Sequence, residues 1–388
     1  MKLNKKLISF FAIYLIHFFA LALSYALLLT FLTSLGYSAT ERSLFFVADA
    51  LFGMVMQVVL GYLCDKYRKV KPFLYGCYAV YVVAAFFLYR TTGKIFFIHL
   101  LLVMLIGSLQ RITIGLLDSF TMEQDPDYKE NFGTIRMWGS IGWAIGSPLA
   151  AVLVTRFGYP VLGVSFFISV IVLVIILMFI DDVYVKNNRV PITSADIRKL
   201  FENKNYVMVV IILFVLFSVD LMQSYTVVDK IMALNGNEQN VGNYFALCAI
   251  VELPLFFIGG KLVKKYGVIK LTAFAAGMFV IRYCIYGFAT TVGQIFIGGL
   301  LQAFTFPIIT VTGKLLVDQQ TPDNMKVSGQ QVALAVYSGG SALIAPFVCG
   351  LVTDMFGVNA AMFFTAFEAL IGFGLCLLFI RKQRPNIQ

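Results

Sequence analysis

Long apolar stretches, repeated along almost the whole chain, constrain the fold of this sequence more than any other feature. Of its 388 residues, 60% are hydrophobic and 13% are charged, whereas a soluble domain has about 45–50% apolar and about 25% charged residues. A helix needs about 20 consecutive apolar residues to cross a bilayer. We therefore predict an all-α membrane protein with twelve transmembrane helices. They span residues 7–33, 42–62, 73–90, 96–117, 134–156, 160–181, 206–227, 242–260, 270–289, 292–316, 328–353 and 358–380.

Lysine and arginine in the connections predict how these helices are oriented. Cytoplasmic loops of membrane proteins carry an excess of both residues, and here alternate connections hold most of them, at residues 2–6, 66–71, 186–204, 261–270 and 381–384. We therefore expect a multi-pass protein of the plasma membrane, embedded in the lipid bilayer, with both termini cytoplasmic. This topology also explains the net charge of +10, so no nucleic-acid partner is expected.

Residues that would indicate an enzyme are scarce. The chain has two histidines and six cysteines. The cysteines lack the C-x-x-C spacing that is typical of a metal site or a redox pair. The sequence also has no G-x-x-x-x-G-K-S/T phosphate loop, the motif that binds nucleotide phosphates. We expect neither an enzyme nor a metal ion or cofactor, and we do not expect ATP to drive the protein.

An internal repeat divides the predicted helices six and six around a polar stretch. "GYLCDKYRKVK" from Gly61 resembles "GKLVKKYGVIK" from Gly260, and "LVTRFG" ending at Gly158 resembles "LVTDMFG" ending at Gly357, both at an offset of 199 residues. Many secondary transporters are built from such repeats and bind substrate between them. We predict an N-terminal bundle, a cytoplasmic central loop and a C-terminal bundle, covering residues 1–181, 182–205 and 206–388.

The loop that follows the second predicted helix resembles the signature of the major facilitator superfamily. In "GYLCDKYRKVK" the signature G-x-L-x-D-R/K-x-G-R/K-R/K is matched at Gly61, Leu63, Asp65, Lys66 and Lys69, and Arg68 stands where the family usually has glycine. The resemblance implies the major facilitator fold, with two pseudo-symmetric six-helix bundles. It also implies a gating role for Gly61, Asp65 and Lys66.

Ionisable residues inside the predicted helices are candidates for function, because each costs about 2.5–3.5 kcal/mol at the centre of a membrane helix on insertion scales. We identify eight of them: His17, Asp49, Arg111, Asp118, Arg136, Asp220, Glu252 and Arg282.

Four side chains in the N-terminal half form a possible binding constellation. Arg111 and Asp118 are seven residues apart, as are Arg136 and Trp143, and this spacing places each pair on one helix face. A carboxylate and a guanidinium can bind several sugar hydroxyls in a fixed geometry, and an indole can stack on a pyranose ring. The alternatives are an Asp–Arg pair that only joins two helices, Trp143 as ordinary packing, and an ion pair between Arg111 and Asp49.

A more specific resemblance supports the binding interpretation. "LLDSF", followed by "RMWGSIGW", is similar to the corresponding part of the lactose permease and its oligosaccharide:proton symporter relatives. That resemblance implies that Asp118, Arg136 and Trp143 bind sugar. It also implies that Glu252, in "ELPLFF", binds sugar and couples it to the proton, and that Arg282 is the arginine of the ninth helix.

The C-terminal half departs from this pattern. Gly299, Gln302 and Thr305 stand where the lactose permease has the lysine, histidine and glutamate of its proton relay, which puts the coupling mechanism in doubt. Candidates for proton coupling are Glu252, Asp220, Arg282 and His17, although His17 can equally be a hydrogen-bonded residue that lines the pore.

These observations predict a monomeric secondary transporter that takes up a sugar or glycoside with protons by alternating access. Two arginines against one acid in the N-terminal half could instead favour an organic anion, such as an aromatic acid or a sugar acid, and a nucleoside is a further alternative. Drug efflux fits less well, because Arg111 and Arg136 are cations in the expected cavity. A sensor or scaffold on a transporter fold has little support in the sequence.

Overall fold

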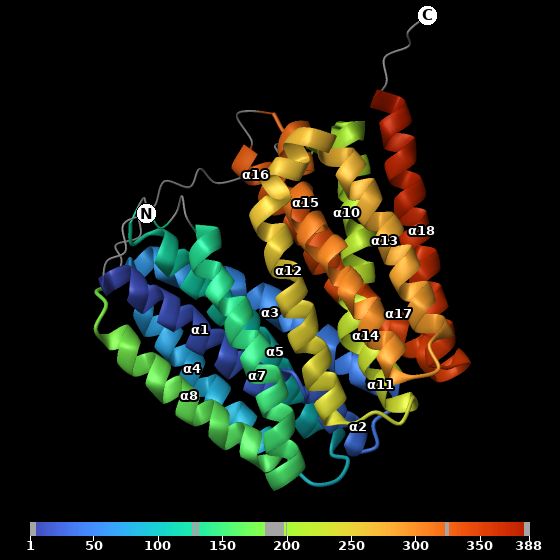
Figure 1. Ribbon diagram of the computed structural model, residues 1–388. Coiled ribbons are helices and arrows are strands. Elements are labelled where there is room, and N and C mark those ends of the chain that lie inside the picture. Colours follow the sequence, from blue (N-terminus) through green and yellow to red (C-terminus); the bar gives the residue numbers. More distant parts are fainter. Residues whose placement is uncertain are drawn as a thin grey trace, which may run out of the picture. The chain divides into compact units, whose positions relative to one another are not determined.

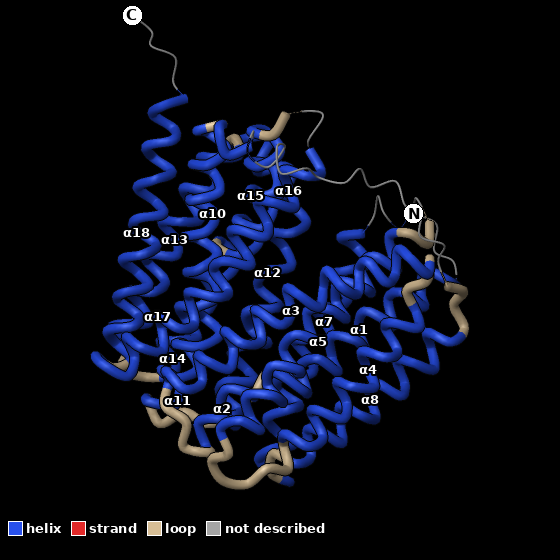
Figure 2. Tube along the Cα trace, turned by 180° about the vertical axis from the view of Figure 1, so that it is seen from behind, coloured by secondary structure: helices blue, strands red, loops and turns tan. Residues whose placement is uncertain are grey.

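The structure, a computed structural model, describes residues 5–125, 128, 132–182, 198, 200–322 and 326–383. These residues fold almost entirely into helices with short connections (Figures 1 and 2). Contacts divide the chain into two compact units. Unit 1 comprises the described residues of Met1–Asn188 and Gly236–Ile250, and unit 2 those of Arg189–Asn235 and Val251–Gln388.

Unit 1 is a helical bundle whose segments are apolar enough to lie in a bilayer, where a helix satisfies all of its own backbone hydrogen bonds. In it α1 packs on α7 and α8, α3 packs on α5, and α4 packs on α5 and α8. Its described helices are α1 (Lys5–Tyr25), α2 (Leu28–Ser34), α3 (Ala39–Tyr67), α4 (Lys71–Leu88), α5 (Phe96–Met122), α7 (Phe132–Phe157) and α8 (Pro160–Met178).

Unit 2 is a bundle in which several helices are interrupted by irregular turns. In it α13 packs on α18 and α15, and α10 packs on α17, α18 and α15. Its described elements are α10 (Lys204–Met222), the π-helical turn η1 (Gln223–Val227), α11 (Val228–Ala233), α13 (Val268–Phe288), α14 (Val292–Leu300), the 3-10 turn η2 (Leu301–Phe304), α15 (Phe306–Gln320), α16 (Lys326–Leu334), the π-helical turn η4 (Ala335–Gly340), α17 (Ser341–Phe356) and α18 (Val358–Gln383).

Helix α12 (Glu238–Tyr266) begins in unit 1 and ends in unit 2. It contains Pro254 and bends by 57° between its segments Glu238–Phe256 and Ile258–Tyr266. A proline removes a backbone hydrogen bond and commonly kinks a helix. Within the described residues, eleven segments are long and apolar enough to cross a membrane, and α12 is a twelfth if its two parts form one span. The predicted all-α membrane fold with twelve transmembrane helices is confirmed.

The repeat found in the sequence is visible in the helix boundaries. Helices α3 and α12 begin 199 residues apart and also end 199 residues apart. Gly158 and Gly357 follow α7 and α17 with positive φ angles of 76° and 84°. The predicted bundle limits of 1–181 and 206–388 remain a prediction, and most of the predicted central loop 182–205 lies outside the described residues.

Candidate functional site

Three glycines of α7 bring its backbone against α1. A Cβ atom added at Gly142 would collide with the carbonyl oxygen of Leu15 and lie 3.0 Å from the backbone nitrogen of Phe19. At Gly139 an added Cβ would lie 2.5 Å from the Phe18 ring, and at Gly146 it would lie 2.8 Å from the Phe19 carbonyl oxygen. Small residues allow membrane helices to pack at such short range, and here they place the α7 side chains next to the aromatic residues of α1.

Asp118 of α5 and Arg136 of α7 come together beside these aromatic residues. The Arg136 Nε and Asp118 Oδ1 atoms are 3.9 Å apart, with 33% and 25% of the two side chains exposed. The Tyr14 hydroxyl of α1 donates to Asp118 Oδ1 over 2.8 Å and also lies 3.2 Å from the Thr121 hydroxyl. The Arg136 guanidinium carbon lies 4.0 Å from the centroid of the Phe18 ring, within the range of a cation–π interaction. The acid and the guanidinium are thus held by α1, and both side chains stay partly exposed.

Arg111 forms a different and closer ion pair. Its Nη2 atom is 2.5 Å from Asp49 Oδ1, and the Asp49 side chain is 2% exposed while that of Arg111 is 39% exposed. Two glycines make room for the pair: a Cβ at Gly107 would collide with the Asp49 carboxylate, and one at Gly53 would lie 3.1 Å from Arg111 Nη2. This is the Asp49 pairing that the sequence left open as an alternative. A role of Arg111 in substrate binding remains a prediction.

Trp143 and His17 are the remaining candidates of unit 1. Trp143 is half-buried, and its contribution to binding stays a prediction. Trp138, to which no role was assigned, stacks on Phe11 with ring centroids 5.3 Å apart. His17 is fully buried on α1, and its Nδ1 atom makes a 2.8 Å hydrogen bond with the Tyr78 hydroxyl of α4. Among the described residues the buried Nε2 atom of His17 has no hydrogen-bond partner.

Arg282 of α13 is the centre of a hydrogen-bond network in unit 2. The side chain is fully buried, and it donates to four uncharged side chains. Nε donates to the Tyr286 hydroxyl over 2.7 Å, Nη1 donates to Gln302 Oε1 and, over 3.2 Å, to the Thr305 hydroxyl, and Nη2 donates to Gln223 Oε1. Buried polar groups are costly unless they are hydrogen-bonded, and these neutral oxygens accept hydrogen bonds from all three guanidinium nitrogens.

The two glutamine partners of Arg282 lie on irregular turns. Gln223 begins the π-helical turn η1, and Gln302 lies in the 3-10 turn η2. Turns of the π type within helices are frequent at functional sites. Gln302 uses its second polar atom as well, since Nε2 donates to Glu252 Oε1 of α12 over 2.5 Å. One amide therefore joins Glu252 to Arg282.

Two acids in unit 2 have poorly satisfied oxygens. Asp220 of α10 is half-buried and interacts electrostatically with Arg282, but its buried Oδ1 atom accepts no hydrogen bond from the described residues. The same holds for Oε2 of Glu368 in α18, whose carboxyl group is within hydrogen-bonding reach of Ser218. Glu368 was missed in the sequence analysis, although it is a charged residue inside the predicted helix 358–380 and the same criterion would have found it.

The predicted gating residues lie in the last turns of α3. Gly61 is half-buried and Lys66 is exposed. The side chain of Asp65 lies outside the described part of the structure. The gating role of all three residues remains a prediction.

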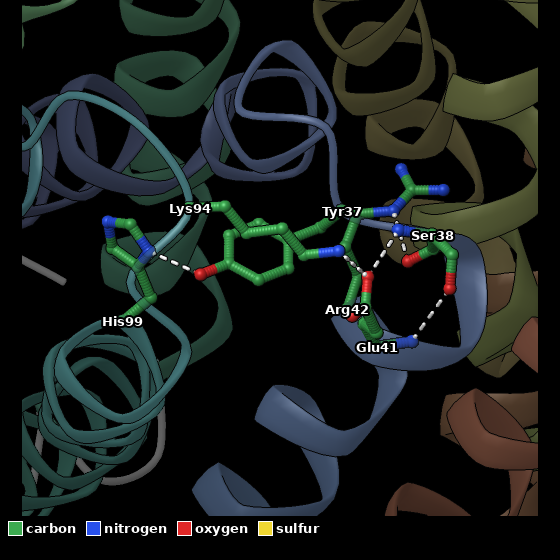
Figure 3. Close-up of polar contacts among 6 residues, drawn as sticks. All are labelled: Tyr37, Ser38, Glu41, Arg42, Lys94 and His99. Carbon is green, nitrogen blue, oxygen red and sulfur yellow. Dashed lines mark hydrogen bonds and ion pairs between the residues drawn. The ribbon is translucent and has the colours of Figure 1, made fainter.

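A polar cluster joins the start of α3 to the start of α5 (Figure 3). Ser38 and Glu41 cap α3 reciprocally, and Lys94 Nζ is 2.6 Å from Glu41 Oε2. His99 is buried, and its two ring nitrogens share 2.6 Å hydrogen bonds with the Tyr37 and Thr91 hydroxyls. Burial and the nearby Glu41 raise the pKa of Tyr37 above its usual value. Among the described residues, neither this cluster nor any other contains three metal-ligating side chains placed to hold a metal ion.

Comparisons with known proteins agree with the fold. A family model described as the MFS_1 like family matches residues 7–366. The chain is 21% identical to the maltose permease of Geobacillus stearothermophilus, over 85% of this chain and 83% of that protein. It is 22% identical to the putative nucleoside transporter YegT of Escherichia coli (strain K12), over 83% of this chain and 79% of that protein. A crystal structure of the nucleoside transporter NupG superposes with a TM-score of 0.84 at 14% identity, covering 97% of this chain and 100% of that one.

Proposed function

The chain belongs to the MFS_1 like family and is a multi-pass membrane transporter rather than an enzyme; from this premise we propose that it takes up a sugar or glycoside together with protons. The resemblance to a maltose permease supports the choice of substrate class. In the proposal it is a monomer of the plasma membrane with both termini in the cytoplasm, and the two predicted bundles rock to give alternating access.

The partly exposed Asp118–Arg136 pair is the observation that carries the proposal. The two groups are 3.9 Å apart, too far for a hydrogen bond, with 25% and 33% of their side chains exposed, so a ligand hydroxyl can reach Asp118 as a donor while another accepts from Arg136. Phe18 and Tyr14 hold the two groups from one side. Trp143 lies seven residues beyond Arg136 on the same face of α7, where its indole can stack on a sugar ring.

The remaining predicted roles are part of the same proposal. Glu252 contributes to substrate binding, and the proton is carried by one of Glu252, Asp220 or His17, with Arg282 as the neighbouring cation. Gly61, Asp65 and Lys66 act in gating.

A nucleoside is the second candidate substrate. Two of the comparisons are with proteins named as nucleoside transporters, and a nucleoside has ribose hydroxyls for Asp118 and Arg136 and a base that can stack on an aromatic ring. An organic anion has less support, because Arg111 is paired with Asp49. The two arginines proposed for the site are then matched by two acids, Asp49 and Asp118. Drug efflux remains the weakest alternative.

Tryptophan fluorescence can test the substrate class directly. The chain has two tryptophans, so Trp138→Phe leaves Trp143 as the single reporter. We would screen this purified variant with maltose and other sugars, uridine, adenosine and aromatic acids, and repeat the screen with Arg136→Gln added. A response to sugars that Arg136→Gln abolishes supports the proposal. A response to nucleosides or to acids alone contradicts the sugar assignment and selects the corresponding alternative.

Uptake by proteoliposomes tests the coupling. Labelled maltose, or the compound that the screen selects, should accumulate under an inward proton gradient, and a protonophore should abolish the accumulation. Accumulation that is indifferent to the protonophore would contradict proton coupling.

A further inference from the structure

Unit 2 brings one buried cation and two acids into a single network. Arg282 donates to Gln302, Gln302 donates to Glu252, and Asp220 interacts electrostatically with Arg282. If both acids were ionised, the three groups would carry a net charge of −1. A net charge is costly in a low-dielectric interior, so the favoured state of the network is neutral and has one proton shared between the two acids.

Hydrogen bonding distinguishes the two acids. The Gln302 amide is oriented at both ends, since its oxygen accepts from Arg282 and its nitrogen therefore points at Glu252. A donor aimed at a carboxylate favours the ionised form. Asp220 Oδ1 is buried and accepts no hydrogen bond from the described residues, although Asp220 interacts electrostatically with the Arg282 guanidinium. An oxygen without a donor is poorly stabilised as an anion.

We infer that the two acids of unit 2 have separate tasks: Gln302 holds Glu252 as an ionised hydrogen-bond acceptor for the substrate, and Asp220 binds the transported proton. Gln302 is then a positioning residue, because it acts through Glu252. This inference rests on the proposed proton-coupled function and assigns its proton site. The step itself is a simple ionisation, in which the Asp220 carboxyl group releases its proton to water when water reaches it and takes one up from water on the other side.

Other titratable groups near this part of α10 define the controls. Tyr283 and Tyr286 of α13 and Cys349 of α17 face the same region, and Tyr283 donates to the Val219 carbonyl oxygen. Tyr337 of η4 packs on Phe217. The remaining acid is Glu368, which also has a buried oxygen without a hydrogen-bond partner among the described residues but lies near Ser218 rather than in the Arg282 network. Glu368→Gln is therefore a matched control for Asp220→Asn.

Infrared difference spectra of the purified full-length protein, recorded between acidic and alkaline buffer, can test the proton site without any substrate. The carbonyl band of a protonated carboxyl group should lose intensity in Asp220→Asn and keep it in Glu252→Gln. Gln302→Leu, which removes the donor to Glu252, should add a second band of this kind. A spectrum that loses the band in Glu252→Gln and keeps it in Asp220→Asn would overturn the inference.

Transport by the same variants separates this inference from the proposed function. With labelled maltose in proteoliposomes, Asp220→Asn should lose at least tenfold in gradient-driven accumulation while maltose exchange falls by less than threefold, and Glu252→Gln should lose both. Glu368→Gln should behave as the unmodified protein. If the unmodified protein does not respond to a proton gradient, the proposed coupling fails; if it responds and Asp220→Asn still accumulates maltose, only the assignment of Asp220 fails. Should Asp220→Asn not fold, Asp220→Glu must retain accumulation with an altered pH dependence, and its failure to do so contradicts the assignment.

Discussion

The two units share a repeated scaffold but carry their ionisable residues at different places in it. The residue 199 positions after Asp49 is Cys248, and the residue 199 positions before Glu252 is Gly53, which makes room for Arg111. In unit 1 the two candidate acids each have an arginine of their own, in the Asp49–Arg111 and Asp118–Arg136 pairs. In unit 2 one arginine faces two acids and is held by neutral oxygens.

This difference indicates that the two units share the positions of their helices but not the positions of their ionisable side chains. The two Asp–Arg pairs of unit 1 are balanced in charge without a proton, so their polar atoms suit the binding of an uncharged ligand. The network of unit 2 is balanced only when one acid is protonated, which suits coupling to a proton gradient. Substitutions that disturb one unit should therefore differ in kind from those that disturb the other.

Arg282→Met should have the largest effect on stability. It leaves the oxygens of Gln223 and Gln302 without their donor and removes the cation that faces Asp220, and breaking a buried charged network costs about 3–5 kcal/mol. We expect a large drop in the apparent melting temperature in detergent. Arg282→Lys keeps the charge but not the planar donor geometry and should recover only part of the loss. Unchanged melting of Arg282→Met would refute the network as a source of stability.

Gly142→Ala should rank second and should act on unit 1 alone. Its new Cβ would collide with the Leu15 carbonyl oxygen, and a backbone atom cannot move aside as a flexible side chain can, so α1 and α7 must separate. Overpacking of this kind costs about 1–3 kcal/mol. Gly115→Ala on α5, where an added Cβ meets no atom within 4 Å, is the matched control and should melt like the unmodified protein. Equal melting of the two variants would show that the close contact of α1 and α7 does not matter.

The two ion pairs of unit 1 should respond differently when each acid is neutralised. Asp49→Asn weakens a 2.5 Å contact to a carboxylate that is 2% exposed, and hydrogen bonds to charged groups contribute about 1.5–3 kcal/mol. Asp118→Asn acts on a 3.9 Å pair with both side chains partly exposed, so its stability cost should be at most about 1 kcal/mol. The comparison is made by thermal melting together with the Trp143 fluorescence titration. We expect Asp49→Asn to lower mainly the melting temperature and Asp118→Asn mainly the affinity for substrate; the reverse pattern would contradict the assignment of the binding pair.

Periodicity and composition predicted the fold well because few backbone conformations are stable in a bilayer. Backbone groups in lipid must be satisfied within helices, so the length and hydropathy of each stretch were enough to find twelve spans. The irregular turns η1 and η2 were not predictable in this way, since no residue pattern in "QSYTV" or "LQAF" separates them from the helices around them.

The candidate site was predicted only in part, because spacing along one helix says which side chains share a face but not which helix lies opposite. The seven-residue spacing of Arg111 and Asp118 is a feature of α5 itself. That Arg111 is paired with Asp49 depends on the packing of α3 on α5 and on the room left by Gly53 and Gly107. In unit 2, Gln302 was noticed only for the residue it replaces, and its two hydrogen bonds become apparent once α12, α13 and η2 are in place.

The loops that follow α3 and α12 differ at equivalent positions of the two copies of the repeat. Arg68 has φ 54° and ψ 36°, a left-handed conformation that costs a residue with a Cβ roughly 1–2 kcal/mol. Its counterpart Gly267 has φ 82° and ψ 154°, in a region open essentially to glycine alone.

Arg68→Gly should therefore be more stable than Arg68→Ala by about 1 kcal/mol, since both variants lose the guanidinium and only one keeps the Cβ. Gly267→Ala should be destabilised by about 1–3 kcal/mol. Melting temperatures of the three variants decide the matter: if alanine is tolerated as well as glycine at both positions, the loop conformations are not under the strain that the backbone angles indicate.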